Sequence, residues 1–193
     1  MTFRKLTTSL LLAGLTFGSS VLHAADYAID TKGAHAFIQF RVQHLGYSWL
    51  YGRFNEFSGN FSYDESKPEE AAIEVTIKTD SVDSNHAERD KHLRSDEFLD
   101  VKKFPEAKFV STSYTPGSNG TGVLKGKLTL RGVTKPVEIE VESIGAGDDP
   151  WGGYRRGFQG STRFAMADFG IMKDLGPKSK DVEMILSLEG IKK

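Results

Sequence analysis

The sequence predicts an all-β domain folded as an eight-stranded antiparallel β-barrel, with one or two short helices inserted between the third and fourth strands. Apolar and polar residues alternate with a period of two in eight separate runs, which places alternate side chains on opposite faces of a strand. Several runs reach about eight to ten residues, longer than the usual mean of about five to six. Hairpin-sized loops separate adjacent runs, which indicates antiparallel pairing. A sandwich of two sheets would also accommodate this alternation and stays open.

The eight predicted strands follow one another along the chain and share an apolar face that we expect to point inward. Long strands with one apolar and one polar face suit a barrel that meets water outside and encloses apolar side chains. Loops at residues 116–120 and 131–134 are typical of hairpins. The inward positions, run by run, are Ala36, Ile38, Phe40, Val42; Phe57, Gly59, Phe61, Tyr63; Ile73, Val75, Ile77; Ala107, Phe109, Ser111; Leu124, Gly126, Leu128, Leu130; Val137, Ile139, Val141; Gly160, Thr162, Phe164; and Val182, Met184, Leu186, Leu188.

The helical insertion is predicted from two start signals between the third and fourth runs. Asn85 is a candidate N-cap with Glu88 three residues later, and residues 87–94 contain neither glycine nor proline. Ser95 begins a second candidate helix, which must end before Pro105. We expect residues 86–99 to lie across one end of the barrel as a lid.

The barrel interior is predicted to be at least partly hollow. Eight strands is the size at which a barrel either fills itself with side chains or retains room for one ligand. Gly59, Gly126 and Gly160 occupy inward positions without side chains, and glycine weakens a strand unless the space is needed. The alternative is that these glycines permit bends at barrel corners. An occupant of this interior should be apolar, because its walls are aliphatic and aromatic.

The N-terminus has the order of a secretory signal peptide. Arg4 and Lys5 precede an apolar stretch over residues 6–17, and small residues lead to Ala24. The stretch is shorter than the roughly 20 residues of a membrane span, so we expect cleavage after Ala24 rather than anchoring. We therefore predict a signal peptide over residues 1–24, a single domain over residues 25–193 and a periplasmic location.

Composition excludes several classes of function. The chain contains no cysteine, so we expect neither disulfides nor a lipid-modified cysteine, and no stable membrane anchor. Loss of Arg4 and Lys5 with the leader brings the net charge from −1 to −3, which gives no basic field for nucleic acid. No nucleophile elbow, phosphate loop or dinucleotide fingerprint appears, so we expect no catalytic residue and no enzyme. A homodimer is left open.

Several long motifs closely resemble the YceI-like family of periplasmic proteins, in the family's order and over essentially the whole predicted domain. The motifs are FRVQHLGYSWLYG at residues 40–52, HAERDKHLRS at 86–95, LTLRGVTKPV at 128–137, DDPWGG at 148–153 and DLGP at 174–177. The resemblance implies a lipocalin-like barrel with an elongated apolar tunnel. It also implies binding, transport or storage of a polyisoprenoid lipid, either an isoprenoid quinone or a polyprenyl phosphate, with no cofactor besides that bound lipid.

The candidate lipid-binding residues are inward apolar side chains, residues of the helical insertion and the two tryptophans in glycine-flanked loops. They are Ile38, Phe40, Val42, Trp49, Leu50, Phe57, Phe61, Val75, Ile77, His86, Arg89, Leu93, Phe98, Leu99, Phe109, Leu128, Trp151, Phe164, Met184 and Leu186. Two other functions stay open. One is a stress or scaffold protein with a filled barrel, in which the tryptophans are packing anchors. The other is a lipid-modifying enzyme.

The polar residues of the insertion have three interpretations. His86 and Asp90 lie four residues apart, as metal ligands on one helical face do, but zinc requires three or four convergent ligands, so we expect no metal. Alternatively, His86, Arg89, Asp90 and Arg94 fix the helix over the barrel through salt bridges and hydrogen bonds. In the third interpretation, Arg89 or Arg94 contacts a phosphate or quinone oxygen at the tunnel mouth.

Overall fold

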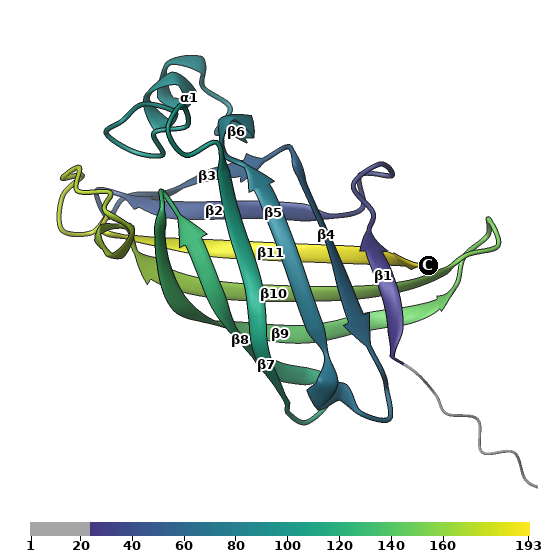
Figure 1. Cartoon of the computed structure of the whole chain (residues 1–193). Coiled ribbons are helices and arrows are strands. Elements are labelled where there is room, and N and C mark those ends of the chain that lie inside the picture. The colour runs from purple at the N-terminus through teal and green to yellow at the C-terminus, as the bar shows by residue number, and fades with distance from the viewer. Residues whose placement is uncertain (1–23) are drawn as a thin grey trace, which may run out of the picture.

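The computed structural model describes residues 24–193, and the predicted signal peptide lies almost entirely outside this range. Its strands form one antiparallel sheet that closes on itself (Figure 1). The closed ring has eight strands, which confirms the predicted barrel and excludes the two-sheet sandwich. In ring order these are β1 (Ala25–Ile29), β4 (Phe57–Tyr63), β5 (Ala72–Lys78), β7 (Glu106–Pro116), β8 (Thr121–Leu130), β9 (Val133–Asp148), β10 (Tyr154–Ala165) and β11 (Asp181–Lys192), with β11 pairing β1.

The first predicted strand lies outside the closed ring, and β1, which was not predicted, takes its place. β11 pairs with β1 through residues 190–192 and with β2 (Phe37–His44) through residues 183–187, so β1 and β2 lie on the same side of β11. β2 continues the sheet to β3 (Ser48–Phe54) and to the two-residue β6 (Val82–Asp83). The sequence patterns predicted β2 but missed β1, β3 and β6.

The helical insertion lies where it was predicted, between β5 and β7, and contains one α-helix. α1 (Ala87–Leu93) begins one residue later than expected, because His86, not Asn85, is its N-cap. Asn85 has a φ of 61° and precedes the cap in the left-handed region. The second predicted helix is absent: residues 95–103 form turns instead, in which Asp100 N–H donates to Ser95 O. Single turns of 3-10 helix occur at Pro68–Glu70, Thr79–Ser81 and Met166–Phe169.

The residues that the alternation predicts to point inward are buried or half-buried in the core. On β2, Ile38 and Phe40 are buried whereas Phe37 is 42% exposed. On β5, Val75 and Ile77 are buried between exposed Glu74 and Lys78. Within residues 24–193, the structure contains no helix of the length and apolarity needed to cross a membrane.

Candidate functional site

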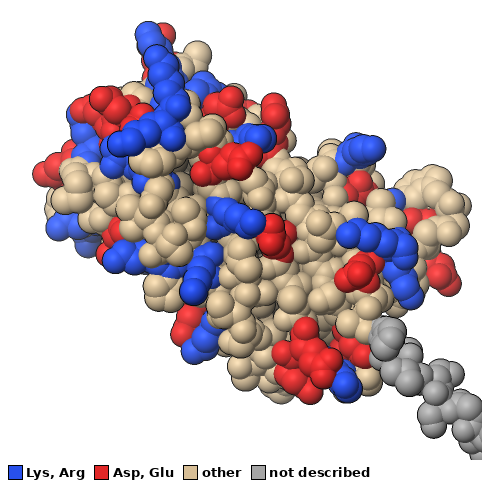
Figure 2. Space-filling model, viewed as in Figure 1, with Lys and Arg blue, Asp and Glu red and all other residues tan. Residues whose placement is uncertain are grey.

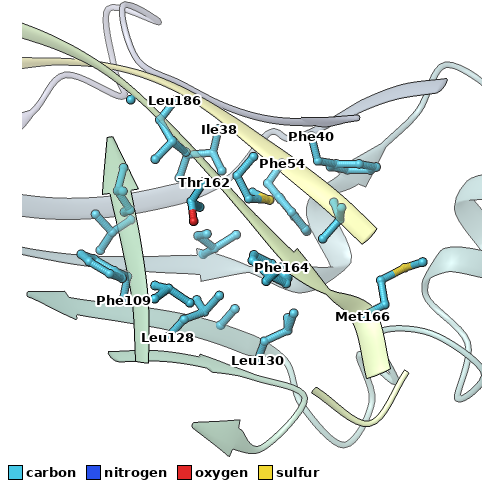
Figure 3. A pocket seen from close by; sticks show the side chains of 18 of the residues that line it. Ile38, Phe40, Phe54, Phe109, Leu128, Leu130, Thr162, Phe164, Met166 and Leu186 are labelled. Carbon is cyan, nitrogen blue, oxygen red and sulfur yellow. The ribbon is translucent and has the colours of Figure 1, made fainter. Parts of the chain in front are cut away.

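The interior of the barrel contains a cavity of about 690 Å³. Aliphatic and aromatic side chains on facing strands point into it, as Figure 3 shows for Ile38, Phe40, Phe109, Leu128 and Leu186. A volume of this size lies within the range of about 300 to 1,000 Å³ that is typical of ligand sites. Eight strands therefore enclose space for a ligand, and that space is predominantly apolar.

The inward glycines give room to aromatic rings on neighbouring strands. A β-carbon on Gly126 would collide with the ring of Phe109, and one on Gly52 would collide with the ring of Phe40. Gly190 is covered in the same way by Phe61. Of the three glycines singled out in the sequence, Gly160 lines the cavity, whereas the space at Gly126 is filled by a ring. Because these glycines have no side chain, the aromatic rings lie close against the barrel wall, and the centre of the barrel stays open.

The cavity reaches the surface at the end of the barrel where β2 and β10 finish. His44, Leu45, His92 and Asp174 line it and are exposed. These residues come from three segments: the β2–β3 turn, the α1 insertion and the loop over residues 170–180. We call this opening the mouth.

Hydrogen bonds hold the segments around the mouth together. Ser179 Oγ donates to Gln43 O and accepts from Leu45 N–H at 3.4 Å, which ties the 170–180 loop to the β2–β3 turn. Arg131 donates to Asp96 O at 2.6 Å and also to Gly170 O, which joins the α1 insertion to the same loop. The mouth is therefore a connected rim rather than three independent loops.

The α1 insertion covers part of the mouth and supplies the cavity with both apolar and charged groups. Leu93, Phe98 and Leu99 line the cavity, and the last two are buried. Half-buried Arg89 also lines it, while its guanidinium donates to Ser84 Oγ at 2.7 Å and to Ser84 O. These contacts support the expectation that residues 86–99 form a lid.

The polar residues of the insertion fix the helix mainly through hydrogen bonds to the backbone. Asp90 is buried and accepts from Ser84 N–H at 2.8 Å. Arg94 donates to Asp80 O and Val82 O. Among the described residues, neither Arg89 nor Arg94 forms an ion pair with a carboxylate, so the salt bridges expected for them are absent.

A buried arginine lies beside the end of the cavity opposite the mouth. Arg156 is 6% exposed, stacks over Tyr63 at 4.5 Å and pairs with Glu65. Tyr63 lines the cavity, so its ring separates the arginine from the interior. Phe61 and Phe158 pack edge-on nearby, with ring centroids 5.7 Å apart. Aromatic side chains therefore face the cavity at this end.

An ion-pair cluster ties the strands together beyond that end. Arg155 on β10 bonds Asp30 Oδ2 at 2.6 Å and Asp149 Oδ2 at 2.7 Å, and it also pairs with Glu189 on β11. Hydrogen bonds from His35 and Arg155 lower the pKa of Asp30 to about 2. Asp30, His35 and Glu189 lie close enough together to ligate a metal. Arg155 already supplies the positive charge that their carboxylates require.

Sixteen of the twenty candidate residues line the cavity, and four do not. Phe57 packs against the core but lies outside the lining, and His86 caps α1 by accepting from Arg89 N–H. Trp49 and Trp151 lie on the outer surface, where each ring stacks with an arginine, Arg41 and Arg155 respectively. The lining residues are Ile38, Phe40, Val42, Leu50, Phe61, Val75, Ile77, Arg89, Leu93, Phe98, Leu99, Phe109, Leu128, Phe164, Met184 and Leu186.

The candidate set missed two groups of lining residues. Ile73, Leu124, Val137, Ile139 and Val182 belong to the predicted inward faces, so alternation could have supplied them. The second group comes from irregular segments without periodicity, and no sequence signal indicated it. Its members include Leu45, Met166, Ile171, Asp174, Leu175 and Ser179. Gln43 also lines the cavity, although it lies on β2 at a position that the alternation places on the outer face.

The chain therefore belongs to the class of closed antiparallel β-barrels whose interior retains a cavity. The YceI-like domain matches residues 27–190, so the chain belongs to the YceI-like family. A "UPF0312 protein" of Shewanella denitrificans is 60% identical over 98% of both chains. One of Pseudomonas aeruginosa is 55% identical over the same shares.

Solved structures share the fold. The Campylobacter jejuni YCEI protein superposes with a TM-score of 0.71 at 28% identity, over 79% of this chain and 90% of that one. A protein described as a polyisoprenoid binding domain from Saccharophagus degradans, implicated in plant cell wall breakdown, gives a TM-score of 0.63 at 16% identity. That match covers 89% of this chain and all of the other. The second likeness concerns the fold alone.

Proposed function

We propose that the protein binds one long polyisoprenoid lipid in the barrel cavity and carries or stores it in the periplasm without chemical change. The observation that carries this proposal is the apolar cavity of about 690 Å³ inside a closed barrel, which reaches the surface at the mouth. The neighbour described as a polyisoprenoid binding domain has the same fold and supports this class of ligand. The leader-like N-terminus supports export.

The shape of the cavity suits a chain better than a compact molecule. Along β10 its lining extends from Phe158 to Met166, which corresponds to about 26 Å of extended strand. Each methylene-sized group removed from water contributes about 0.8 kcal/mol, so a long hydrocarbon tail gains most when it is enclosed along its length. A narrow space that follows the strands provides this enclosure.

The polar residues at the mouth support an orientation with the tail inside and the head group at the rim. Arg89 lines the cavity, and its guanidinium, bonded to Ser84, has no carboxylate partner among the described residues. A guanidinium of this kind is suited to a phosphate or a quinone oxygen. The opposite end is lined with aromatic rings. The ligand is accordingly an isoprenoid quinone or a polyprenyl phosphate that enters tail first.

The lining favours binding over catalysis. Within residues 24–193, no serine or threonine hydroxyl bonds a histidine ring, which is the arrangement that activates the nucleophile in serine-type hydrolases. Ser179 Oγ is engaged by the backbone of the β2–β3 turn, and His92 Nε2 contacts Glu97. The cavity also disfavours the alternative of a scaffold protein with a filled barrel.

Organic extraction of protein purified from a bacterial host, followed by mass spectrometry, tests this proposal. We expect a prenyl lipid at close to one molecule per chain. Delipidated protein should then take up a long-chain quinone or a polyprenyl phosphate from detergent. Absence of lipid from the extract, together with failure to take up either compound, would refute the carrier function.

A further inference from the structure

Exposed apolar side chains project from the rim of the mouth. Tyr47 at the tip of the β2–β3 turn is 86% exposed, and Met172 in the 170–180 loop is 75% exposed. Leu45 lines the cavity and is still 54% exposed. Large apolar side chains rarely gather at the tips of neighbouring loops unless they contact a partner or a membrane. These three residues therefore form an apolar rim around the cavity opening.

Lysines accompany the apolar rim. Residues 170–180 contain Lys173, Lys178 and Lys180 against one acidic residue, Asp174, so this loop has a net charge of +2 in a chain of net charge −1. Lys178 packs across Gly46, next to Tyr47, since a β-carbon on Gly46 would lie 3.4 Å from Lys178 Cγ. Among the described residues, neither Lys178 nor Lys180 forms an ion pair. Their charges are available to an anionic surface.

Exposed apolar side chains also occur at the opposite end of the barrel. The β9–β10 hairpin also exposes apolar side chains, Ile144 and Trp151, but its tip carries Asp148 and Asp149 and no lysine. The two ends are well separated in Figure 1, with α1 and the 170–180 loop at one end and this hairpin at the other. The 170–180 loop thus places lysines without an ion-pair partner among the described residues beside the apolar rim, whereas the hairpin tip has no lysine; the α1 insertion beside the mouth carries acidic as well as basic residues.

We infer that the mouth docks on the surface of an anionic lipid bilayer, with Tyr47 and Met172 inserted at the level of the head groups and the lysines against the anionic lipid. This inference rests on the proposed lipid-binding function and adds the surface through which the lipid is exchanged. Aromatic and apolar tips sit at the level of the head groups, and each nearby lysine strengthens binding to anionic lipid about fivefold. Docking in this orientation places the cavity opening directly on the bilayer, so a prenyl tail moves between the two without crossing water.

Vesicle flotation of the purified protein tests the docking surface. We expect the protein to float with vesicles of equal parts phosphatidylglycerol and phosphatidylcholine, and at least tenfold less with phosphatidylcholine alone. High salt should release it, because at 1 M the screening length falls to about 3 Å. Equal binding to both vesicles, or none to either, would overturn the inference.

Substitutions at the two ends of the barrel locate the surface. Lys178→Gln should weaken vesicle binding about fivefold, and Tyr47→Ser with Met172→Ser should weaken it at least tenfold. The matched controls are Lys32→Gln and Ile144→Ser, which change an exposed lysine and an exposed apolar residue at the opposite end. If the controls reduce binding as much as the mouth variants do, the protein docks through another surface and the inference is wrong.

Lipid content separates this inference from the proposed function. Tyr47 and Met172 do not line the cavity, so the double variant should retain its prenyl lipid in the extract while it loses vesicle binding. Wild-type protein that carries lipid but binds no vesicle would overturn the docking surface and leave the carrier function standing. Light scattering that shows a dimer lost in Tyr47→Ser, without vesicle binding, would assign the rim to a second copy instead.

Discussion

Phe40→Asp tests whether the inward face of β2 borders an apolar interior. The Phe40 ring is 8% exposed, contacts Phe54 with ring centroids 5.8 Å apart and covers Gly52. Loss of a buried phenylalanine ring costs about 3 to 5 kcal/mol. Burial of the new carboxyl raises its pKa above the unfolded value near 3.9, and each unit of that shift adds about 1.4 kcal/mol at neutral pH. We expect a total loss of about 4 to 7 kcal/mol, which is comparable to the whole stability of many domains.

The charge-dependent part of this loss should vary with pH. The carboxyl is neutral in both states well below the unfolded pKa, so its penalty is small near pH 4 and grows as the pH rises toward the folded pKa. Urea unfolding at pH 4 and pH 7 measures this difference. Phe40→Leu, which removes the ring without adding a charge, should cost less than Phe40→Asp and show no such pH dependence.

Phe37→Asp is the matched control, because Phe37 lies on the same strand and points outward with 42% of its surface exposed. We expect this variant to lose less than about 1 kcal/mol and to keep its lipid. Equal stabilities of the Phe37→Asp and Phe40→Asp variants, with equal lipid content, would refute the assignment of the inward face.

Two further predictions concern the ends of the barrel. The lowered pKa of Asp30, held at about 2 by His35 and Arg155, stabilises the fold above pH 4, and that stability is lost as the pH falls toward 2. The loss should be about 1 to 2 kcal/mol after allowance for solvent screening, and urea unfolding of Asp30→Asn should lack this part of the acid dependence. Amide hydrogen exchange should show residues 86–99 opening faster than residues 124–130, with bound lipid slowing the former selectively. Equal, lipid-insensitive exchange would make the segment a fixed plug.

The sequence predicted the barrel because most strands keep one face apolar and the other polar over their whole length. β3 escaped prediction because Trp49 and Tyr51 are aromatic on its outer face while Gly52 lies on its inner face, which erases the alternation. Trp49 is stable outside because Arg41 stacks over its ring at 4.3 Å. β1 and β6 span only five and two residues, too few for a period to appear.

Local changes of register also limited the prediction. β7 shifts its pairing with β8 between Ser111 and Ser113, so the inward face continues at Tyr114 rather than at Ser113. The alternation of apolar and polar residues cannot reveal such a bulge, because the extra residue can be identified only from the pairing with the partner strand. The residues of the mouth escaped prediction for the same reason, because only the fold brings them together. Leu45 and Ser179 meet through the fold, and neither segment has a periodic pattern.

The number of lipid molecules per chain in the wild type and two variants tests the central claim most directly. Thr162 points into the cavity (Figure 3), and Arg163, its neighbour on β10, is 61% exposed on the outer face. Acidic and basic side chains are mixed on the face that Figure 2 shows, and loss of the exposed Arg163–Asp181 ion pair should cost about 1 kcal/mol or less. Mass spectrometry of extracts should find close to one prenyl lipid per chain in the wild type and in Arg163→Trp, and far less in Thr162→Trp, whose indole projects into the cavity and obstructs the path of the tail. Equal lipid content in all three folded proteins would contradict a ligand inside the barrel.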